Sequence, residues 1–351
     1  MYRTRIALAL ASAAVCIAGA AGDRAAIAAQ PRLPAQQQAI VQTGAGGPEV
    51  LELESIPVPR PGPGQVLIRV HAAAVNPGDW AQLARPPAAG GSDRSVPGQD
   101  VSGVIVAVGE GISDRRPGMA VFGIVDRAGL NGAYAHYAVA NVSSTAPKPR
   151  SVSFAQAAGL GVVGVTALRV IDQGQVHAGK RVLILGVAGG VGSLAAQIAV
   201  ARGATVLGTA SPRHAAYLRS IGVSRIINYA AGDVAAHAGR VDVVIDTVGG
   251  NEALAALDAL GAGGRFVSIA RAQVSPGQCA ARQLQCLGSP GPAGRAPPSV
   301  ILQVARLAAE GELSVHIDRV FPLAHAAEAL RYVHRGHTEG KVILAVTPDA
   351  R

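Results

Sequence analysis

Lys180-Arg181-Val182-Leu183-Ile184-Leu185 runs directly into Gly186-Val187-Ala188-Gly189-Gly190-Val191-Gly192, and an alanine-rich segment follows. The apolar run predicts a buried strand, and the spacing from Val191 to Arg202 predicts a helix. Glycines between a strand and a helix let the backbone approach a pyrophosphate, which the N–H groups and the positive dipole of the helix start attract. This order therefore predicts a dinucleotide site, against the alternative of a tight turn in an α/β domain without a ligand.

The strand that follows this helix predicts which dinucleotide is bound. Residues 204–209 form a second apolar run, and Ala210-Ser211-Pro212-Arg213-His214 comes next. A site for NADH places an acid at the end of this strand to hold the ribose 2′-hydroxyl, but the next acid here is Asp233. A hydroxyl and a guanidinium suit a 2′-phosphate, so Ser211 and Arg213 predict NADPH. The same residues are also typical of a helix N-cap followed by a solvated arginine.

The composition predicts a folded chain of about two domains. It has 351 residues, of which 49% are hydrophobic and 15% charged. The net charge of +9 comes mainly from scattered arginines, without a dense basic run or interleaved aromatic residues, so nucleic acid is not an expected partner. The nine histidines are dispersed and the three cysteines do not cluster, so no metal site is predicted.

The first thirty residues differ from the rest of the chain. Arg3 and Arg5 precede an uncharged apolar stretch over residues 6–21, and small residues suited to cleavage follow. This layout predicts a secretory signal peptide over residues 1–29 and a linker over 30–38. The apolar stretch is short for a membrane span, so no stable span is expected in the mature chain. The alternatives are export to the periplasm and a misassigned start codon ahead of a cytoplasmic enzyme.

Residues 271–298 are rich in Gly and Pro and are predicted to form a mobile loop near the cofactor. Cys279 and Cys286 lie in this loop. A disulfide between them is compatible with an oxidising compartment, and two free thiols are the alternative.

Two patterns of secondary structure divide the remainder. Short strands separated by Gly and Pro predict a β-barrel-like domain up to about residue 145, and alternating strands and helices predict a doubly wound parallel sheet from residue 154 onward. The first strands are expected at 50–53, 65–70, 101–108, 119–122 and 133–139. The parallel strands are expected at 181–185, 204–209, 225–228, 241–245 and 264–269, with helices at 191–202, 213–220 and 251–260. The tail is expected to form a helix at 299–310, a strand at 315–320, a helix at 323–334 and a strand at 341–346.

Several motifs along residues 39–346 occur together in a known family. They are Gly46-Gly47-Pro48-Glu49-Val50-Leu51, Pro61-Gly62-Pro63-Gly64-Gln65-Val66-Leu67, His71-Ala72-Ala73-Ala74-Val75-Asn76-Pro77-Gly78-Asp79-Trp80, Pro97-Gly98-Gln99-Asp100-Val101-Ser102-Gly103-Val104, Gly118-Met119-Ala120-Val121-Phe122-Gly123, the glycine turn, and Gly340-Lys341-Val342-Ile343-Leu344. In combination they resemble the zinc-independent medium-chain dehydrogenase/reductases, specifically the quinone oxidoreductase (zeta-crystallin-like) branch.

The resemblance implies a GroES-like β-barrel-type domain over residues 39–155, completed by about 316–351, and an NADP-binding Rossmann domain over 156–315. NADPH is expected in the cleft between them. Zinc-using relatives place a Cys ligand near the position of Ala74 and a lobe of four Cys after the first strands, and this chain has neither. Relatives are commonly homodimers, so a homodimer is expected.

The resemblance also assigns site residues. It places Asn76 beside the nicotinamide ribose or the substrate, against the alternative of an Asx-type turn before Pro77. It places Tyr134 on a strand that lines the cleft, against the alternative of core packing. The cofactor residues that it implies are Gly189, Gly190 and Val191 for the pyrophosphate, Ser211 and Arg213 for the 2′-phosphate, Tyr229 for the adenosine phosphate end and Thr166 for the nicotinamide amide.

The predicted activity is zinc-independent hydride transfer from NADPH to a quinone or to the C=C bond of an enone. Such a substrate needs only a hydrogen-bond donor or water to polarise its carbonyl, because the cofactor carries the reaction. A trans-enoyl thioester reductase is a second enzymatic hypothesis. A non-catalytic NADPH-binding sensor or structural protein is a third, from another class, and turnover with a quinone distinguishes it from the other two.

Overall fold

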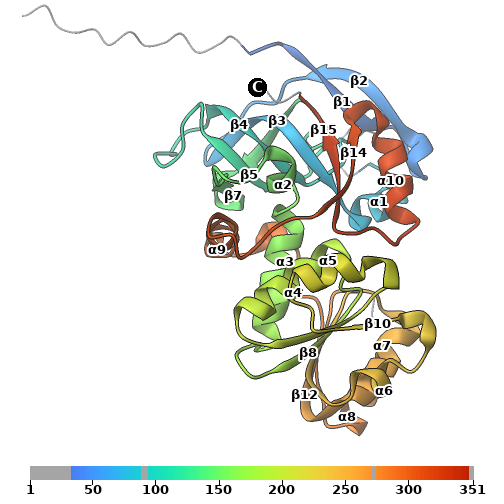
Figure 1. Cartoon of the computed structure of the whole chain (residues 1–351). Coiled ribbons are helices and arrows are strands. Elements are labelled where there is room, and N and C mark those ends of the chain that lie inside the picture. The colour runs from blue at the N-terminus through green and yellow to red at the C-terminus, as the bar shows by residue number, and fades with distance from the viewer. Residues whose placement is uncertain (1–32, 88–93, 271–273, 348–351) are drawn as a thin grey trace, which may run out of the picture. The chain divides into compact units, whose positions relative to one another are not determined.

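The computed structural model of the chain describes residues 33–87, 94–270 and 274–347. The predicted signal peptide at 1–29 lies outside these residues. Residues 35–351 fold as one unit that contains two large sheets, and both sheets are visible in Figure 1.

The first large sheet is parallel and has the strand order β10-β9-β8-β11-β12-β13. In β8, Val182 and Ile184 pack into one hydrophobic core, and Leu183 and Leu185 pack into another on the opposite face. Because both faces are covered, the strand is apolar on both sides. The strands are β8 (Arg181–Leu185), β9 (Thr205–Thr209), β10 (Arg225–Ile227), β11 (Val241–Asp246), β12 (Leu260–Ser268) and β13 (Gln285–Leu287), and the helices are α3 (Gly161–Gln173), α4 (Gly190–Ala201), α5 (Ala215–Ser220), α6 (Val234–Ala238), α7 (Gly250–Ala256) and α8 (Pro276–Ala281).

The glycine turn connects β8 to α4 as the sequence predicts. Gly186 has a φ of +70°, a conformation that other residues rarely adopt. A Cβ atom on Gly192 would lie 2.4 Å from the carbonyl oxygen of Gly186, so only glycine allows α4 to start this close to the strand. The N-cap of α4 is Gly189, and no side chain caps the helix. Its first N–H groups are therefore open to an anionic ligand.

The second large sheet has seven strands in the order β14-β15-β3-β4-β5-β7, with β6 also paired to β3. The last strand of the chain pairs antiparallel with β3, so that Leu344 lies opposite Ala73. Residues from both ends of the chain thus build one domain. The strands are β3 (Gln65–Val75), β4 (Asp100–Val108), β5 (Ala120–Ile124), β6 (Tyr137–Asn141), β7 (Thr145–Pro147), β14 (Ile317–Pro322) and β15 (Lys341–Ala345), and the helices beside them are α1 (Pro77–Leu83), α2 (Phe154–Ala158), α9 (Pro298–Ala309) and α10 (Ala326–His334).

Three expectations about local structure need correction. The linker predicted at 30–38 ends earlier, because β1 (Gln36–Gln42) pairs with β2 (Leu51–Pro57) and the Gln37 side chain accepts the Tyr137 N–H at 2.6 Å. The strand predicted at 133–139 is β6, at 137–141. Residues 133–135 instead pair with the loop at 97–98 and with β1.

The third correction concerns the loop predicted at 271–298. Its described residues contain α8 and β13, and β13 adds a sixth strand to the parallel sheet beside β12. A disulfide joins Cys279 on α8 to Cys286 on β13. The sequence did not predict α8 and β13, because the many glycines and prolines of this segment are typical of a loop.

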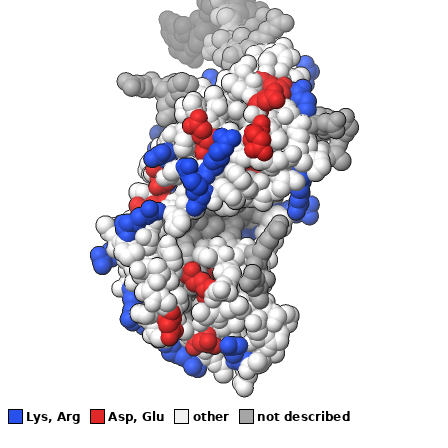
Figure 2. All heavy atoms as spheres, turned by 90° about the vertical axis from the view of Figure 1, so that its right-hand side faces the viewer, with Lys and Arg blue, Asp and Glu red and all other residues white. Residues whose placement is uncertain are grey.

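The surface carries both signs of charge. On the face shown in Figure 2, basic and acidic residues are interspersed, and the middle of the face is hollowed. The net charge of +9 is therefore not gathered into one basic patch on this face. Among the residues that the structure describes, no helix is both long and apolar enough to cross a membrane.

Candidate active site

A cleft of about 800 Å³ lies at the carboxyl end of β8. Five of the predicted site residues line it: Asn76, Thr166, Gly189, Gly190 and Val191. They come from three separate parts of the chain, namely the turn after β3, helix α3 and the glycine turn. Other parts of the lining come from two segments later in the chain and include Ser289, Gly291, Pro292, Ala293, Gly336, Thr338, Gly340, Lys341 and Val342.

A second cavity of about 430 Å³ adjoins this cleft on the side of β9. It is lined by Ser211, which is predicted for the 2′-phosphate, and by Tyr229, which is predicted for the adenosine phosphate end. Five residues line both cavities, which makes them contiguous: Gly189, Thr247, Val248, Gly336 and Thr338. The uncapped start of α4 lies at this junction, so its N–H groups suit a diphosphate that connects two halves of a ligand. The cavities fit a nicotinamide dinucleotide.

The C-terminal segment, residues 336–341, belongs to the β domain and lines both cavities. The Gly340 N–H donates to the Ala188 carbonyl at 2.8 Å, beside the glycine turn. The Glu339 carboxylate contacts His214 Nδ1 at 2.6 Å and His316 Nε2 at 3.1 Å. His214 comes from the start of α5, so this acid connects the C-terminal segment to the dinucleotide domain.

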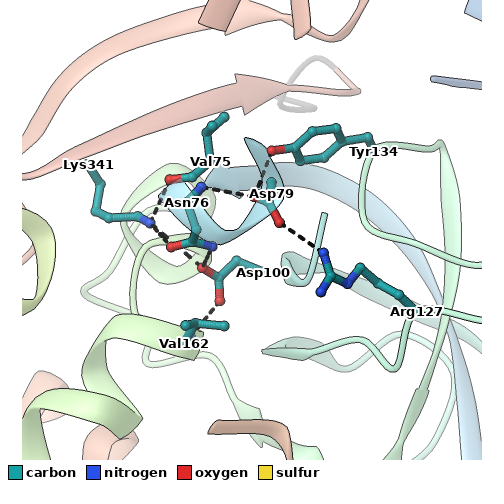
Figure 3. A network of polar contacts seen from close by, with 8 residues as sticks. All are labelled: Val75, Asn76, Asp79, Asp100, Arg127, Tyr134, Val162 and Lys341. Carbon is teal, nitrogen blue, oxygen red and sulfur yellow. Dashed lines mark hydrogen bonds and ion pairs between the residues drawn. The ribbon is translucent and has the colours of Figure 1, made fainter. Parts of the chain in front are cut away.

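Asn76 belongs to a buried polar network (Figure 3). Its Nδ2 donates to Asp100 Oδ2 at 2.8 Å, and its Oδ1 accepts a hydrogen bond from Lys341 Nζ at 2.6 Å. Lys341 Nζ also donates to the Val75 carbonyl at 2.9 Å, and Asp100 Oδ1 accepts the Val162 N–H at 2.5 Å. Because Lys can only donate and a carboxylate can only accept, the two charged groups determine which way the Asn76 amide points.

Burial sets the electrostatics of this network. Asp100 is fully buried and Lys341 is 4% exposed, with 3.8 Å between Nζ and Oδ2. Burial raises the pKa of Asp100 to about 6, against the opposing effects of Lys341 and Asn76. Burial also lowers the pKa of Lys341, while Asp100 opposes that change. The pair places one positive and one negative charge within the wall of the cleft, each held by neutral hydrogen-bond partners.

Tyr134 lies in the core and not in the cleft. Its side chain has no exposed surface, its ring packs against Gly98, and its hydroxyl donates to Asp79 Oδ2 at 3.0 Å. The same Asp79 accepts the Asn76 N–H at 2.9 Å and pairs with Arg127. This position matches the alternative of core packing, and a catalytic role for Tyr134 stays a prediction.

Arg213 is also placed differently from the prediction. It does not line the cavity that holds Ser211. Its Nη2 donates to the His337 carbonyl at 2.5 Å, and its Nε donates to His214 Nε2 at 3.1 Å. Since Nε2 accepts, the proton of the His214 ring lies on Nδ1, which donates to Glu339. Arg213 thus connects α5 to the C-terminal segment in this structure.

Sequence reasoning did not assign roles to Asp100 and Lys341, although both lie in motifs that carry the resemblance. A signal for them was present. Each is a charge at the start of an otherwise apolar strand, and the chain has only three lysines. A charged side chain at the end of a buried strand requires an opposite charge or a hydrogen-bond partner. That partner could not be identified, because Lys341 and Asn76 are separated by 265 positions.

The described residues contain no group of three or more His, Cys, Asp or Glu side chains that could hold a metal ion. The cleft lining includes one titratable side chain among these residues, Lys341, and its Nζ is already bonded within the network.

A parallel sheet with a glycine turn, joined to a β domain at a cleft of this kind, defines a nicotinamide-dependent oxidoreductase. Comparisons with known proteins agree. Residues 62–150 match the model of the alcohol dehydrogenase GroES-like domain, and residues 221–344 match that of a zinc-binding dehydrogenase.

Comparison with individual relatives also indicates an oxidoreductase. The chain is 32% identical, over 92% of its length and 83% of the relative's, to an NADPH-dependent alkenal/one oxidoreductase of Arabidopsis thaliana. It is 34% identical to a quinone oxidoreductase of Rattus norvegicus over 69% of its length and 77% of the relative's. A solved quinone oxidoreductase of Coxiella burnetii matches 89% of this chain with all of its own, at a TM-score of 0.80 and 32% identity. The chain belongs to the medium-chain dehydrogenase/reductase family, in the quinone oxidoreductase branch, and is an oxidoreductase.

Proposed function

We propose that this enzyme reduces a quinone or an enone with NADPH as hydride donor and without zinc. The observation that carries the proposal is the cleft at the glycine turn, whose described lining is neutral except for the bonded Lys341. A neutral lining suits an uncharged, electron-poor carbonyl compound. The activities for which the relatives are named, quinone and alkenal/one reduction, support the same substrate class.

The cofactor, when bound, supplies the hydride. The N–H groups at the start of α4 would hold its diphosphate, and Thr166, which lines the cleft, would bond to the nicotinamide amide. Asn76 has two amide protons, of which one is donated to Asp100. The second is available to a carbonyl oxygen in the cleft, where charge develops as hydride reaches the substrate. Lys341 and Asp100 act as positioning residues, because they orient this amide.

The proton that completes the reduction comes from solvent water in this proposal. Lys341 is the only titratable side chain that lines the cleft among the described residues, and Nζ donates to Val75 and Asn76. Independence from zinc is supported by the described residues, which contain no group of three or more His, Cys, Asp or Glu side chains suited to a metal ion, and by the small number of cysteines. The preference for NADPH is supported by Ser211 and by the lack of an acid at the end of β9.

The test is turnover by the purified full chain. NADPH or NADH is mixed with 9,10-phenanthrenequinone, 2-cyclohexenone or crotonyl-CoA, and nicotinamide absorbance is followed after treatment with a chelator. We expect oxidation of NADPH with the quinone or the enone, and about a 100-fold lower kcat/KM for Asn76→Ala. Turnover of crotonyl-CoA alone would indicate the enoyl thioester reductase instead. Binding of NADPH without turnover of any of the three would refute the proposal.

Two further proposals concern the cellular compartment and the oligomeric state of the protein. The Cys279–Cys286 disulfide favours an oxidising compartment and hence export, which cell fractionation tests. The homodimer expected from the family is tested by light scattering after size-exclusion chromatography. Strand β13 forms one edge of the parallel sheet and is one place where a second copy can add.

A further inference from the structure

An acidic side chain lines the cavity of about 430 Å³ that Ser211 and Tyr229 also line, which we call the adenosine cavity. Nothing in the sequence indicated that this acid lies there. The expected position for an acid, at the end of β9, holds Thr209, Ala210 and Ser211. Glu252, on α7, lines the same cavity as these three residues. A cavity at the end of the second strand is where a dinucleotide-binding sheet receives the ribose of adenosine. The acid therefore comes from the element after β11 instead of from β9.

The Glu252 carboxylate has capacity to bind a ligand. Its Oε1 is buried, and no donor among the described residues bonds to it. Burial raises the pKa of Glu252, the Thr209 hydroxyl lowers it, and the nearby Asp246 raises it further. A buried acceptor without a donor is unfavourable, so a ligand that brings a hydroxyl to this atom is stabilised.

Two other acids of this region, Asp246 and Asp233, have donors for their carboxylates. Asp246 is fully buried, but its oxygens accept hydrogen bonds from the N–H groups of Val248 and Gly249 and from the Ser268 hydroxyl. Asp233, the first acid after β9 in the sequence, caps α6 by accepting the Ala236 N–H. Among the described residues that line the adenosine cavity, Glu252 is the only acid, and none is a Lys or an Arg.

We propose that Glu252 determines the dinucleotide selectivity of this enzyme. Its carboxylate accepts a hydrogen bond from a ribose hydroxyl of the adenosine half, and its negative charge opposes a 2′-phosphate at the same position. Ser211 favours the phosphate from the β9 side of the cavity, and Glu252 acts against it from the α7 side. The enzyme consequently accepts NADH as well as NADPH. This inference rests on the proposed function, because it requires that the adenosine half binds in this cavity.

The test uses ligands that carry only the adenosine half, so that binding is measured apart from turnover. Isothermal titration gives the Kd of 2′,5′-ADP and of 5′-AMP for the wild-type chain and for Glu252→Gln, which removes the charge but keeps an acceptor oxygen. We expect Glu252→Gln to bind 2′,5′-ADP about tenfold more tightly and 5′-AMP about as the wild type does. Glu252→Ala, which also removes the acceptor, should bind 5′-AMP several-fold more weakly.

Glu310→Gln is the control, since this exposed acid ends α9 and lines neither cavity. It should bind both ligands as the wild type does. An unchanged ratio of the two Kd values in Glu252→Gln would overturn the proposal, even when the wild type binds both ligands and turns over. Failure of the wild type to bind either ligand would instead show that the cavity assignment in the proposed function is wrong, and the role of Glu252 would be rejected with it.

Discussion

Replacing Lys341 with methionine tests the buried network, because methionine keeps most of the volume of the side chain while removing its charge and its donors. Lys341 Nζ donates to Asn76 Oδ1 at 2.6 Å and to Val75 O at 2.9 Å, and lies 3.8 Å from Asp100 Oδ2. Removing one partner of a buried ion pair costs about 3–5 kcal/mol, since the other charge stays buried without compensation. We expect Lys341→Met to lower the free energy of unfolding at pH 7.5 by that amount.

The pH dependence of this loss distinguishes an uncompensated carboxylate from a packing defect. The pKa of Asp100 is about 6 with Lys341 present, above its ordinary value of 3.8, and Lys341 holds it down. Without Lys341 the pKa of Asp100 rises further. An acid with a raised pKa binds its proton more tightly in the folded chain, so the cost of ionisation is present above the folded pKa and disappears as the pH falls toward the unfolded value. The loss of stability should therefore shrink by about 1–2 kcal/mol between pH 7.5 and pH 5.5.

Urea unfolding of both proteins at the two pH values, without cofactor, measures this effect. The control is Lys180→Met, because Lys180 pairs with Asp242 at 3.5 Å on the surface, where such a pair contributes less than about 1 kcal/mol. Adding Asp100→Asn to Lys341→Met should recover about 2 kcal/mol at pH 7.5, since the uncompensated charge is then gone. A loss that is equal at pH 7.5 and pH 5.5, or that Asp100→Asn does not relieve, would refute the reasoning.

Three other variants, two single and one double, each test one feature of the structure. Gly192→Ala should abolish dinucleotide binding and cost about 1–3 kcal/mol of stability, because its Cβ would lie 2.4 Å from a backbone oxygen that cannot move aside; titration with NADPH and a urea melt measure both effects. Tyr134→Phe should cost about 1–2 kcal/mol through loss of the bond to Asp79 while leaving kcat within twofold, and a tenfold fall in kcat would restore a catalytic role for the hydroxyl. Replacing Cys279 and Cys286 with serine should lower stability by about 2–3 kcal/mol, and the difference from the wild type should disappear when a reductant is added to both; equal melts without reductant would contradict this.

The features that the sequence predicted correctly are mostly local ones. The strand, the glycine turn and the helix are continuous in the chain, and their order alone defines a dinucleotide fold. Gln37 shows why the first strand was missed, since a buried amide in a polar run resembles a linker until its partner, the Tyr137 N–H, is known. Strand β13 was missed because three residues between Gly- and Pro-rich stretches carry too little pattern to identify a strand.

The parts of the site that the backbone forms could be predicted from the sequence. The parts that depend on where a side chain points could be predicted less well. Gly189, Gly190 and Val191 line the cleft as expected, because their positions follow from the turn. Arg213 was assigned to a phosphate from the chemistry of its guanidinium group and from the family resemblance, whereas in this structure its side chain bonds to the His337 carbonyl. Glu252 had no sequence signal for a cofactor role, since the fold and not the chain order brings α7 to the end of β9.

The C-terminal segment connects these observations. Over residues 336–341 it lines the adenosine cavity, holds His214 through Glu339, pairs with the glycine turn through Gly340, and orients Asn76 through Lys341. Each contact joins the β domain to the dinucleotide domain or to the reacting end of the cleft. In the proposed function, a dinucleotide that spans both cavities would contact the same short segment in each of them. The cavity that Glu252 lines and the network that orients the Asn76 amide therefore share one segment, so variants of either residue should be measured for binding and for turnover together.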